Sequence, residues 1–568
     1  MSASAASGTS PAGAATPSRL RVWLPVLLLC SVQAVLLLRT AWDKSDTIDE
    51  PHYLANAFQQ WQHGDLTGNC ESPAFPKWGF AAALRLADPR LFDPQVRQGH
   101  HPLWSRPQPQ TRRNLFAARC VTVVLTVLAG LLLFLAASRF GRHAALATLA
   151  LWCFSPTVLA AGSLATLDAW AAGLMAAAVW AGVRFVERPR AAWAAVLGAL
   201  LALAAASKVT TLGLAPVLAV LLVWAARRGA QGGPWLPRAG ALGAWTSLAF
   251  LLTLWTVYGF SVRTLDTGVL CGREVEGFTR RVLGPLPFTP WIEGLLAQWL
   301  HGRKGHHNYL FGEVSFDGWW WFFLAAIALK TTLGAQGLAL LRVAVRPPVR
   351  RRDLRIDAAL LAFPMLLLVV LSTGRTQNGI KYLLPAFPFV MLCVGRTVED
   401  VRRAWGRRGQ ALCGALLLAG TLESVAVHPH HLMFFNLWAG GPEGGPRYLI
   451  HGDDWGQDQR RLAEWQKQNR PWRLFYTHYS GNPRHWGISF EQPPCEPRPG
   501  YYALHAVEVH RPKRLPAGCL DWLTVDEPDA RLGYSIYLYL ANKPRLAQLQ
   551  ARRGRVEPFW SSAQEEVR

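Results

Sequence analysis

The chain has 568 residues, of which 51% are hydrophobic and only 17% are charged, and it contains 26 Trp. Long runs rich in Leu, Ala and Val recur, and a bilayer-crossing helix needs roughly 20 predominantly apolar residues. This composition excludes a purely soluble protein and predicts a polytopic α-helical membrane protein. The net charge of +23 would favour a nucleic-acid partner in a soluble chain. Here Arg and Lys concentrate in short segments between apolar runs, as the positive-inside rule describes, so we predict no nucleic-acid partner.

The first segment of the chain precedes its first apolar run. Residues 1–17 are Ser, Ala, Gly, Pro and Thr with no charge beyond the terminus and no periodicity, so we predict that residues 1–20 form a disordered cytoplasmic N-terminus. Arg19 and Arg21 then precede an apolar run at 22–38. The run resembles a signal peptide, but no convincing cleavage site follows and more apolar runs do. We therefore expect a retained first helix.

About eleven transmembrane helices are predicted within residues 21–428. An odd number of spans puts the two ends of the chain on opposite sides, and the basic connectors between spans then all fall on the cytoplasmic side. The polar segments 41–113 and 261–315, and the tail 429–568, consequently fall outside. The spans after the first lie near residues 115–137, 144–161, 167–186, 191–206, 210–226, 239–260, 318–343, 356–372, 382–397 and 410–427.

The tail at 429–568 is no longer membrane-like. Alternating apolar and polar residues predict strands at 473–476, 501–504 and 534–539, and residues 460–468 are typical of a short helix. We expect a small external α/β domain. The nine cysteines form no metal-ligand pattern. Two pairs fall in the predicted external parts, and either could form a disulfide if that side is oxidising: Cys70 with Cys271, and Cys495 with Cys519.

An acidic pair, Asp49 and Glu50, follows the first apolar run where a chain leaving a membrane would meet water. A carboxylate there can accept a proton from a hydroxyl group, and a lysine nearby can hold a phosphate. Lys77 is the first candidate for that lysine. The alternative is an exposed acidic loop that caps a helix, with Lys77 extending to the membrane surface.

Several further motifs lie on the predicted external side. In chain order they are Asp49-Glu50, His52, Gly64-Asp65, Pro76-Lys77, Gly162 to Asp168, His306 to Ser315, Gly318 to Trp321, Lys330 to Thr332, Gly379 to Pro385, Phe435-Asn436, Gly440 to Pro442, and Asp454 to Asp458. From the first helix to about residue 470, this set resembles the polyprenyl- or dolichyl-phosphate-sugar-dependent glycosyltransferases of GT-C architecture. That group includes the protein O-mannosyltransferases and the bacterial aminoarabinose transferases. The sequence departs from the group at Lys381-Tyr382, where Arg-His is expected, so one positive charge remains but the guanidinium fork is lost.

The resemblance implies that Asp49 is the catalytic carboxylate, with Glu50 beside it. A sugar on a lipid phosphate already has a good leaving group, so the reaction needs a base for the acceptor hydroxyl and cations for the developing phosphate charge. Attack opposite the phosphate inverts the anomeric carbon. The candidates for binding the donor phosphate are Lys77, Lys381 and Lys208.

Four more residues are candidates for binding substrate or a divalent metal. Asp168 near a membrane boundary is costly unless it is paired, which favours a functional role, although a carboxylate at a helix N-terminus is the alternative. His306, His307 and Glu313 could bind a metal together with Glu50 or Asp168, or could be solvated loop residues.

We predict a membrane glycosyltransferase that moves a sugar from a polyprenyl-phosphate donor to a hydroxyl of a protein, lipid or glycan acceptor. The alternative is a transporter or flippase of lipid-linked sugars, but transporters place charged sites near the bilayer midplane, often with internal repeats, and the sequence shows no repeat. A non-catalytic scaffold is a third class. High Ala, Arg and Gly content is typical of a GC-rich bacterial genome, so we expect an inner-membrane protein whose site faces the periplasm. The alternative is a location in the endoplasmic reticulum.

Overall fold

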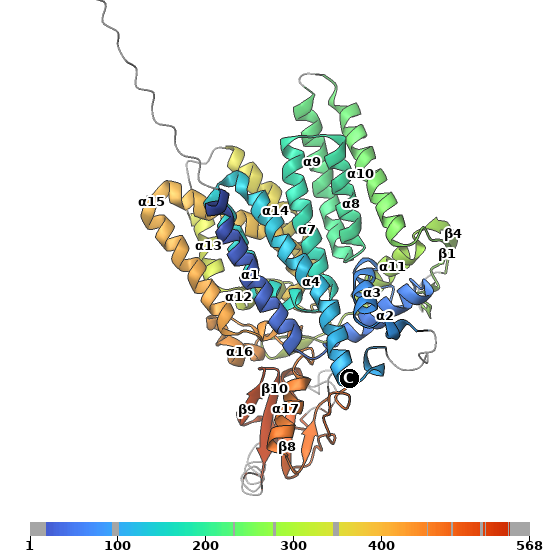
Figure 1. Cartoon of the computed structure of the whole chain (residues 1–568), viewed down its shortest axis with the longest axis vertical. Helices are drawn as coiled ribbons and strands as arrows, with labels where there is room; N and C mark the ends of the chain where they lie inside the picture. Colours follow the sequence, from blue (N-terminus) through green and yellow to red (C-terminus); the bar gives the residue numbers. More distant parts are fainter. Residues whose placement is uncertain are drawn as a thin grey trace, which may run out of the picture.

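A computed structural model describes residues 19–93, 102–230, 233–275, 280–344, 351–450, 452–478, 481–511, 515–516, 518–542 and 545. The predicted disordered N-terminus, residues 1–20, lies outside these residues except for the start of the first helix. Figure 1 shows a bundle of long helices, with a small sheet from the C-terminal part of the chain at its lower end.

The bundle is built from the predicted apolar runs. Its helices are α1 (Arg19–Asp43), α4 (Gln108–Ala137), α5 (Arg142–Cys153), α6 (Pro156–Gly162), α7 (Leu167–Glu187), α8 (Ala191–Ala205), α9 (Leu214–Gly229), α10 (Trp235–Val257), α12 (Phe322–Lys330), α13 (Leu333–Ala344), α14 (Arg351–Ser372) and α15 (Phe387–Ala426). The 3₁₀ turns η4 (Val209–Gly213) and η5 (Ile380–Ala386) lead into α9 and α15. One large apolar cluster, with Trp152, Phe185 and Phe363 among its buried members, joins most of these helices.

Six helices of the described chain are long and apolar enough to cross a membrane, or eight if each bent pair counts as one span. The two bent pairs are α5 with α6, at 57°, and α12 with α13, at 115°. Two shorter apolar helices, 191–205 and 356–372, lie at predicted spans. Helix α15 covers two predicted spans and breaks at Gly406, whose φ of 57° is outside the helical region. The multi-pass helical architecture is confirmed, whereas the predicted count of eleven is not.

Close helix packing depends on small residues, as is common between membrane helices. A Cβ atom at Gly198 of α8 would lie 2.1 Å from the carbonyl oxygen of Thr246 in α10. The Thr246 hydroxyl donates a hydrogen bond to the Ala194 carbonyl across the same contact, at 3.1 Å. The glycine therefore lets the two backbones approach as closely as they do.

The predicted external segments gather at the end of the bundle that carries the C-terminal sheet (Figure 1). The first segment forms α2 (Glu50–His63) and α3 (Phe75–Ala87). The second forms β1 (Val262–Asp266), β2 (Val269–Leu270), β3 (Arg273–Glu274), β4 (Val282–Pro287), α11 (Thr289–Lys304), β5 (Asn308–Leu310) and β6 (Glu313–Ser315). Cys70 and Cys271 form a disulfide that joins the two segments, and Cys495 bonds Cys519 in the tail. Both pairs that the sequence left open are therefore bonded in the structure.

The C-terminal part contains a four-stranded sheet in the order β7-β8-β10-β9. Its strands are β7 (Leu474–Tyr476), β8 (Gly500–His505), β9 (Ala530–Leu532) and β10 (Ile536–Ala541), with helices α16 (Gly441–Gly444), α17 (Gln459–Asn469), α18 (Ala506–His510) and α19 (Asp521–Thr524). Strands β7 and β8 are parallel, and the other pairs are antiparallel. The three predicted strands and the helix near 460–468 are present, whereas β9 was not predicted.

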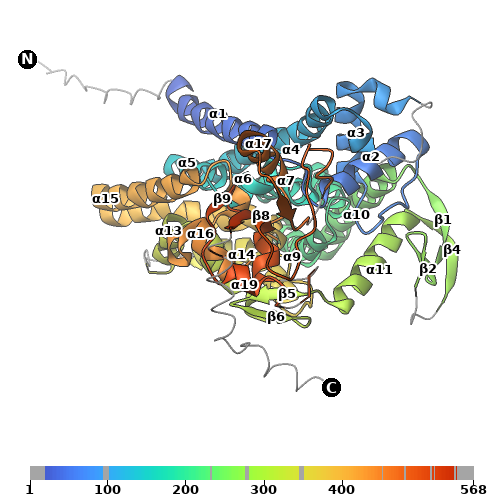
Figure 2. The same cartoon turned by 90° about the horizontal axis from the view of Figure 1, so that it is seen from below.

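Both faces of this sheet are buried, which explains why its strands are almost wholly apolar or aromatic. Side chains of a strand alternate between faces. Tyr476 and Leu538 pack with Leu462 of α17 on one face. Phe475 and Tyr537 pack in a separate cluster on the other. Seen from below, the sheet and α17 lie in front of the ends of the bundle helices (Figure 2). The tail therefore closes the end of the bundle at which the external segments lie.

Candidate active site

Asp49 immediately precedes α2 and occupies the position of its N-cap residue. Its side chain makes no capping hydrogen bond, so the carboxylate is not engaged by the helix, contrary to the alternative of a capping loop. The side chain lies deep among protein atoms but retains 37% of its surface exposed, and its Oδ2 is 4.0 Å from Lys381 Nζ. Burial raises the pKa of Asp49, and the nearby Asp168 raises it further, against the lowering effect of Lys381. This carboxylate can therefore accept a proton.

Unlike the Asp49 carboxylate, the Glu50 carboxylate has hydrogen-bond donors on both of its oxygens. Both of its oxygens accept from the Arg119 guanidinium, at 2.7 and 2.6 Å. The Ala165 amide donates to Oε1 at 2.8 Å, and the amide and hydroxyl of Thr47 donate to Oε2 at 3.0 and 3.1 Å. Burial raises the pKa of Glu50, but Arg119 outweighs it, and the net shift is downward. Since Glu50 and Arg119 are fully buried, the predicted catalytic role of Glu50 is not supported. Glu50 instead fixes the start of α2.

A second ion pair faces the Asp49–Lys381 pair. Asp168, near the start of α7, pairs with Lys208, which precedes η4. Lys208 also lies over the Tyr382 ring, 4.5 Å from its centroid. The expectation that a carboxylate at this depth must be paired is met, and Asp168 and Lys208 are brought together with Lys381.

Lys77 lies among different partners. It is buried in α3 and donates to the carbonyls of Gly68 and Asn69, at 3.4 and 3.1 Å. Burial lowers the pKa of Lys77 to about 7, and the only nearby charge that raises it is Asp65. The structure thus holds Lys77 against the 68–69 turn, which does not support its assignment as the first phosphate ligand.

The predicted metal candidates do not come together. His306 Nε2 lies 2.6 Å from His301 Nε2. The His307 carbonyl accepts from Arg511, and its ring packs against Phe316. Glu313 is exposed on β6. Within the described part of the chain, no group of three His, Cys, Asp or Glu side chains could hold a metal ion. The proposed grouping of these residues with Glu50 or Asp168 is therefore not formed.

Three important residues were not among the predicted site residues. Lys330, at the end of α12, pairs with Asp453 at 2.8 Å and lies 3.9 Å from the centroid of the Phe435 ring. Trp455 covers Lys381, with the ammonium 3.3 Å from the ring centroid. The motifs Lys330-Thr331-Thr332 and Asp454 to Asp458 contain Lys330 and Trp455, whereas Asp453 lies one residue before the second motif. Neither motif by itself indicates its partner.

These residues line a cleft with about 430 Å³ of empty space. Its polar lining includes Thr157, Asp168, Lys330, Lys381 and Asp453. A larger groove of about 1300 Å³ lies between α5, α12, α13, α14 and α15, and its lining is mostly Ala, Leu, Val, Met and Phe. Pro156, Thr157 and Lys330 line both spaces. A charged cleft and an apolar groove in the helical bundle therefore adjoin at Lys330.

Comparison with known proteins bears on this arrangement. Residues 111–256 match the family described as dolichyl-phosphate-mannose-protein mannosyltransferase. No curated protein sequence matches the chain significantly. The fold is similar to a chain of the S. cerevisiae protein O-mannosyltransferase Pmt1–Pmt2 complex bound to the sugar donor, at 12% identity and a TM-score of 0.52, covering 84% of this chain and 96% of that one.

A second solved structure, ArnT from Cupriavidus metallidurans bound to undecaprenyl phosphate, has 14% identity and covers 92% of this chain and 99% of that one. Its TM-score is 0.46. The shared fold confirms the predicted GT-C-like architecture. The match over residues 111–256 is to a mannosyltransferase family and agrees with the predicted glycosyltransferase.

Proposed function

We propose that this chain transfers a sugar from a polyprenyl-phosphate donor to an acceptor hydroxyl group, with Asp49 as the general base and Lys381 and Lys330 as phosphate ligands. One observation carries the proposal. Asp49 is paired with Lys381 at 4.0 Å, and Lys381 lines a charged cleft that adjoins an apolar groove at Lys330. An isoprenoid tail fits an apolar groove, and a phosphate fits a cleft with two ammonium groups.

The chemistry follows from this placement. The acceptor oxygen attacks the anomeric carbon, the bond from that carbon to the phosphate oxygen breaks, and Asp49 takes the hydroxyl proton. The departing polyprenyl phosphate gains one negative charge. Lys381 and Lys330 therefore interact more strongly with the transition state than with the bound donor, which is the condition for catalysis. Attack opposite the phosphate inverts the anomeric centre.

The external side is the proposed location of this reaction. The helices α2, α3 and α11 and the C-terminal sheet lie at the same end of the bundle (Figure 1), and Asp49 immediately precedes α2. Two disulfides lie in these parts, and disulfides persist in oxidising compartments such as the periplasm. This supports a site that faces the periplasm of a bacterial inner membrane. The acceptor is a protein, lipid or glycan.

The decisive experiment supplies membranes containing the full chain with a panel of labelled polyprenyl-phosphate sugars. We compare the wild type with Asp49→Asn and with a control, Asp317→Asn, at an external carboxylate that is 77% exposed. Loss of a general base costs typically 10²–10⁴-fold, so Asp49→Asn should lose at least ~10²-fold in rate and the control should not.

Two outcomes would overturn the proposal. Equal transfer by the wild type and Asp49→Asn would remove Asp49 as the base. No transfer with any donor, together with movement of the labelled lipid across the bilayer, would establish the transporter instead. The anomeric configuration of the product tests inversion directly.

A further inference from the structure

The segment Asp453–Asp458, two acids followed by Trp, Gly, Gln and a third acid, links the tail to the proposed site. Its residues contact different parts of the molecule. The contacts are Asp453 with Lys330 of α12 at 2.8 Å, Asp454 with His505 of β8 at 3.1 Å, Trp455 with Lys381 of η5 at 3.3 Å from the ring centroid, and Asp458 with Lys44 at 2.6 Å. All of these acids and the tryptophan are buried.

The backbone of the 453–458 segment pairs with the loop that leads to Asp49. The Ser45 amide donates to the Gln457 carbonyl at 3.0 Å, and the Ile48 amide donates to the Trp455 carbonyl at 2.9 Å. The Ser45 hydroxyl donates to the Gly456 carbonyl at 3.1 Å. These contacts hold the stretch immediately before Asp49, residues 45–48, at both of its ends.

The Trp455 side chain acts on the other member of the pair. Its ring is buried and lies against the Lys381 ammonium, while Asp49 lies 4.0 Å from that same ammonium. An aromatic face attracts an ammonium group, most strongly where water is excluded. The single residue Trp455 therefore contacts Lys381 through its ring and the Asp49 loop through its carbonyl.

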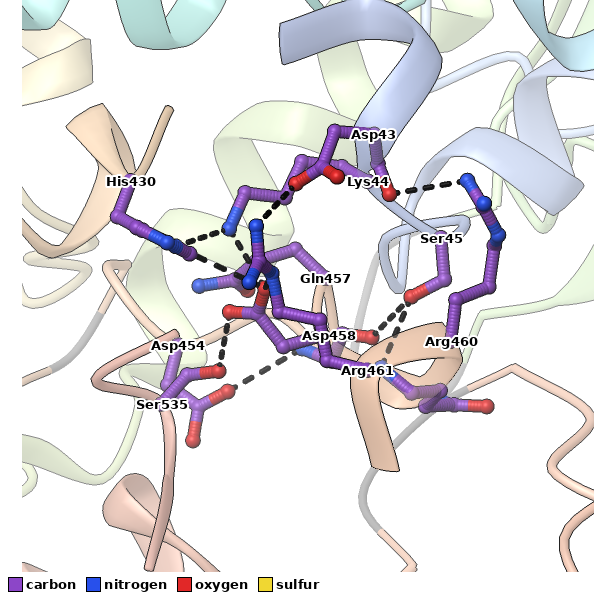
Figure 3. A network of polar contacts seen from close by, with 12 residues as sticks. Asp43, Lys44, Ser45, His430, Asp454, Gln457, Asp458, Arg460, Arg461 and Ser535 are labelled. Carbon is purple, nitrogen blue, oxygen red and sulfur yellow. Dashed lines mark hydrogen bonds and ion pairs between the residues drawn. The ribbon is translucent and has the colours of Figure 1, made fainter. Parts of the chain in front are cut away.

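The far end of the segment is anchored by a dense polar network (Figure 3). Lys44 Nζ lies 2.6 Å from Asp458 and 2.5 Å from His430 Nδ1. The Ser535 hydroxyl donates to the other Asp458 oxygen at 2.7 Å. Burial and the adjacent Lys44 lower the pKa of His430 to about 2, so its neutral ring accepts from the ammonium. Arg461 of α17 reaches back to Asp43 at 2.7 Å.

We propose that the 453–458 segment is a positioning element of the active site and that Trp455 holds Lys381 in the orientation that serves the donor phosphate. This gives the C-terminal part of the chain a role in the reaction: it completes the site instead of only covering it. The proposal rests on the proposed function, since it assigns a purpose to Lys381.

A double-mutant cycle between Trp455 and Lys381 tests it. Full-length wild type, Trp455→Leu, Trp455→Phe, Lys381→Met and the Trp455/Lys381 double variants are assayed for kcat and for donor KM. Trp455→Leu should lower kcat/KM by ~30-fold, since a desolvated ammonium–ring contact contributes about 2 kcal/mol. Trp455→Phe should recover most of that loss, and neither change should matter once Lys381 is Met.

Controls separate positioning from folding. Trp472 lies in the same part of the chain and is 63% exposed, so Trp472→Leu should leave kcat/KM unchanged. The proposal would be overturned if Trp455→Leu lowered kcat/KM by the same factor with Lys381 present and with Met in its place. A structural defect does not depend on Lys381. If Trp455→Leu fails to fold, the Trp455→Phe cycle decides the question by the same criterion.

The outcomes also separate this proposal from the proposed function. Transfer by Asp49→Asn equal to that of the wild type contradicts the role of Asp49, and no transfer with any donor contradicts the function itself. Loss of transfer in Asp49→Asn together with full activity of Trp455→Leu contradicts only the positioning role.

Discussion

The Asp49–Lys381 pair and the Glu50–Arg119 pair begin at consecutive residues but have opposite surroundings. Glu50 and Arg119 are fully buried, and three further donors reach the same carboxylate. Asp49 and Lys381 are 4.0 Å apart, and the Asp49 side chain is 37% exposed. A carboxylate whose lone pairs are all occupied can only hold a structure. One that is loosely paired and reachable can exchange a proton, so position in the sequence alone does not separate the two roles.

The largest expected effect comes from breaking the fully buried Glu50–Arg119 pair. Arg119→Met leaves Glu50 buried without its counter-ion, which costs about 3–5 kcal/mol in measured cases. The variant should express poorly or melt well below the wild type in a thermal-unfolding assay in detergent.

Arg113, six residues earlier on α4 and exposed, provides the matched control, since Arg113→Met should be neutral. The double variant Glu50→Gln with Arg119→Met should recover part of the stability. An Arg119→Met protein as stable as the wild type would contradict the structural role.

Breaking the partly exposed Asp49–Lys381 pair should instead lower the transfer rate and leave the stability of the protein nearly unchanged. Lys381→Met removes a cation from the leaving phosphate, and loss of one such electrostatic contact costs about 10²–10³-fold in kcat. The melting temperature should stay close to that of the wild type. Lys381→Arg keeps the charge and should retain part of the rate.

The control for this variant is Lys304→Met, at an exposed lysine on the external helix α11. Transfer by Lys381→Met within a few-fold of the wild type would exclude Lys381 as a phosphate ligand.

Asp46 is an intermediate case that sharpens the comparison. It is fully buried, and one oxygen accepts from the Trp486 indole at 2.6 Å while the other has no hydrogen-bond partner among the described residues. Burial raises the pKa of Asp46 to about 6. Its ionisation therefore opposes folding as the pH rises from its unfolded pKa toward 6, and the cost is constant above that.

Asp46→Asn should consequently stabilise the protein at pH 7.5 by up to ~3 kcal/mol, the equivalent of a shift of about two pKa units. The advantage should shrink at pH 5, where the native carboxyl group is already protonated. Unfolding temperatures at the two pH values measure it, and a variant that is less stable than the wild type at both would contradict this account.

The smallest expected effect is a displacement of the acid limb of the pH–rate profile. Asp49 must be ionised to act as a base, and its pKa is raised by burial. Below that pKa, kcat/KM should fall about tenfold per pH unit, beginning at a higher pH than an exposed carboxylate near 3.9 would give. Lys381 lowers the pKa of Asp49, so Lys381→Met should move the limb to still higher pH. An acid limb at the same pH in Lys381→Met and in the wild type would mean that a group other than Asp49 controls it.

Much of this architecture could be predicted from the sequence because its causes are local. Apolar length determines the helices, and strands β7, β8 and β10 coincide with short runs of apolar and aromatic residues in an otherwise polar tail. The assignment of Asp49 as the base came from its place just past the first apolar run and from the family resemblance, and it stays a prediction.

The remainder depends on contacts between distant parts of the chain. Nothing near Glu50 indicates that Arg119 will occupy both of its oxygens, or that Lys77 will be held by two carbonyl groups. Lys330 and Trp455 were visible as parts of motifs, but their roles appear only when α12, η5 and the tail meet. The helix α15 is a contrasting case, because hydropathy separates the spans 382–397 and 410–427 and the helix breaks at Gly406, between them.

The backbone pairing between residues 45–48 and the 453–458 segment has a consequence for biogenesis. Asp49 is synthesised early. The loop at 45–48 can pair with the 453–458 segment only after some four hundred more residues have been synthesised and the intervening helices have inserted. The nascent chain therefore carries its proposed base for most of translation without the aligned lysine beside it. The proposed site is therefore complete only after the tail has docked.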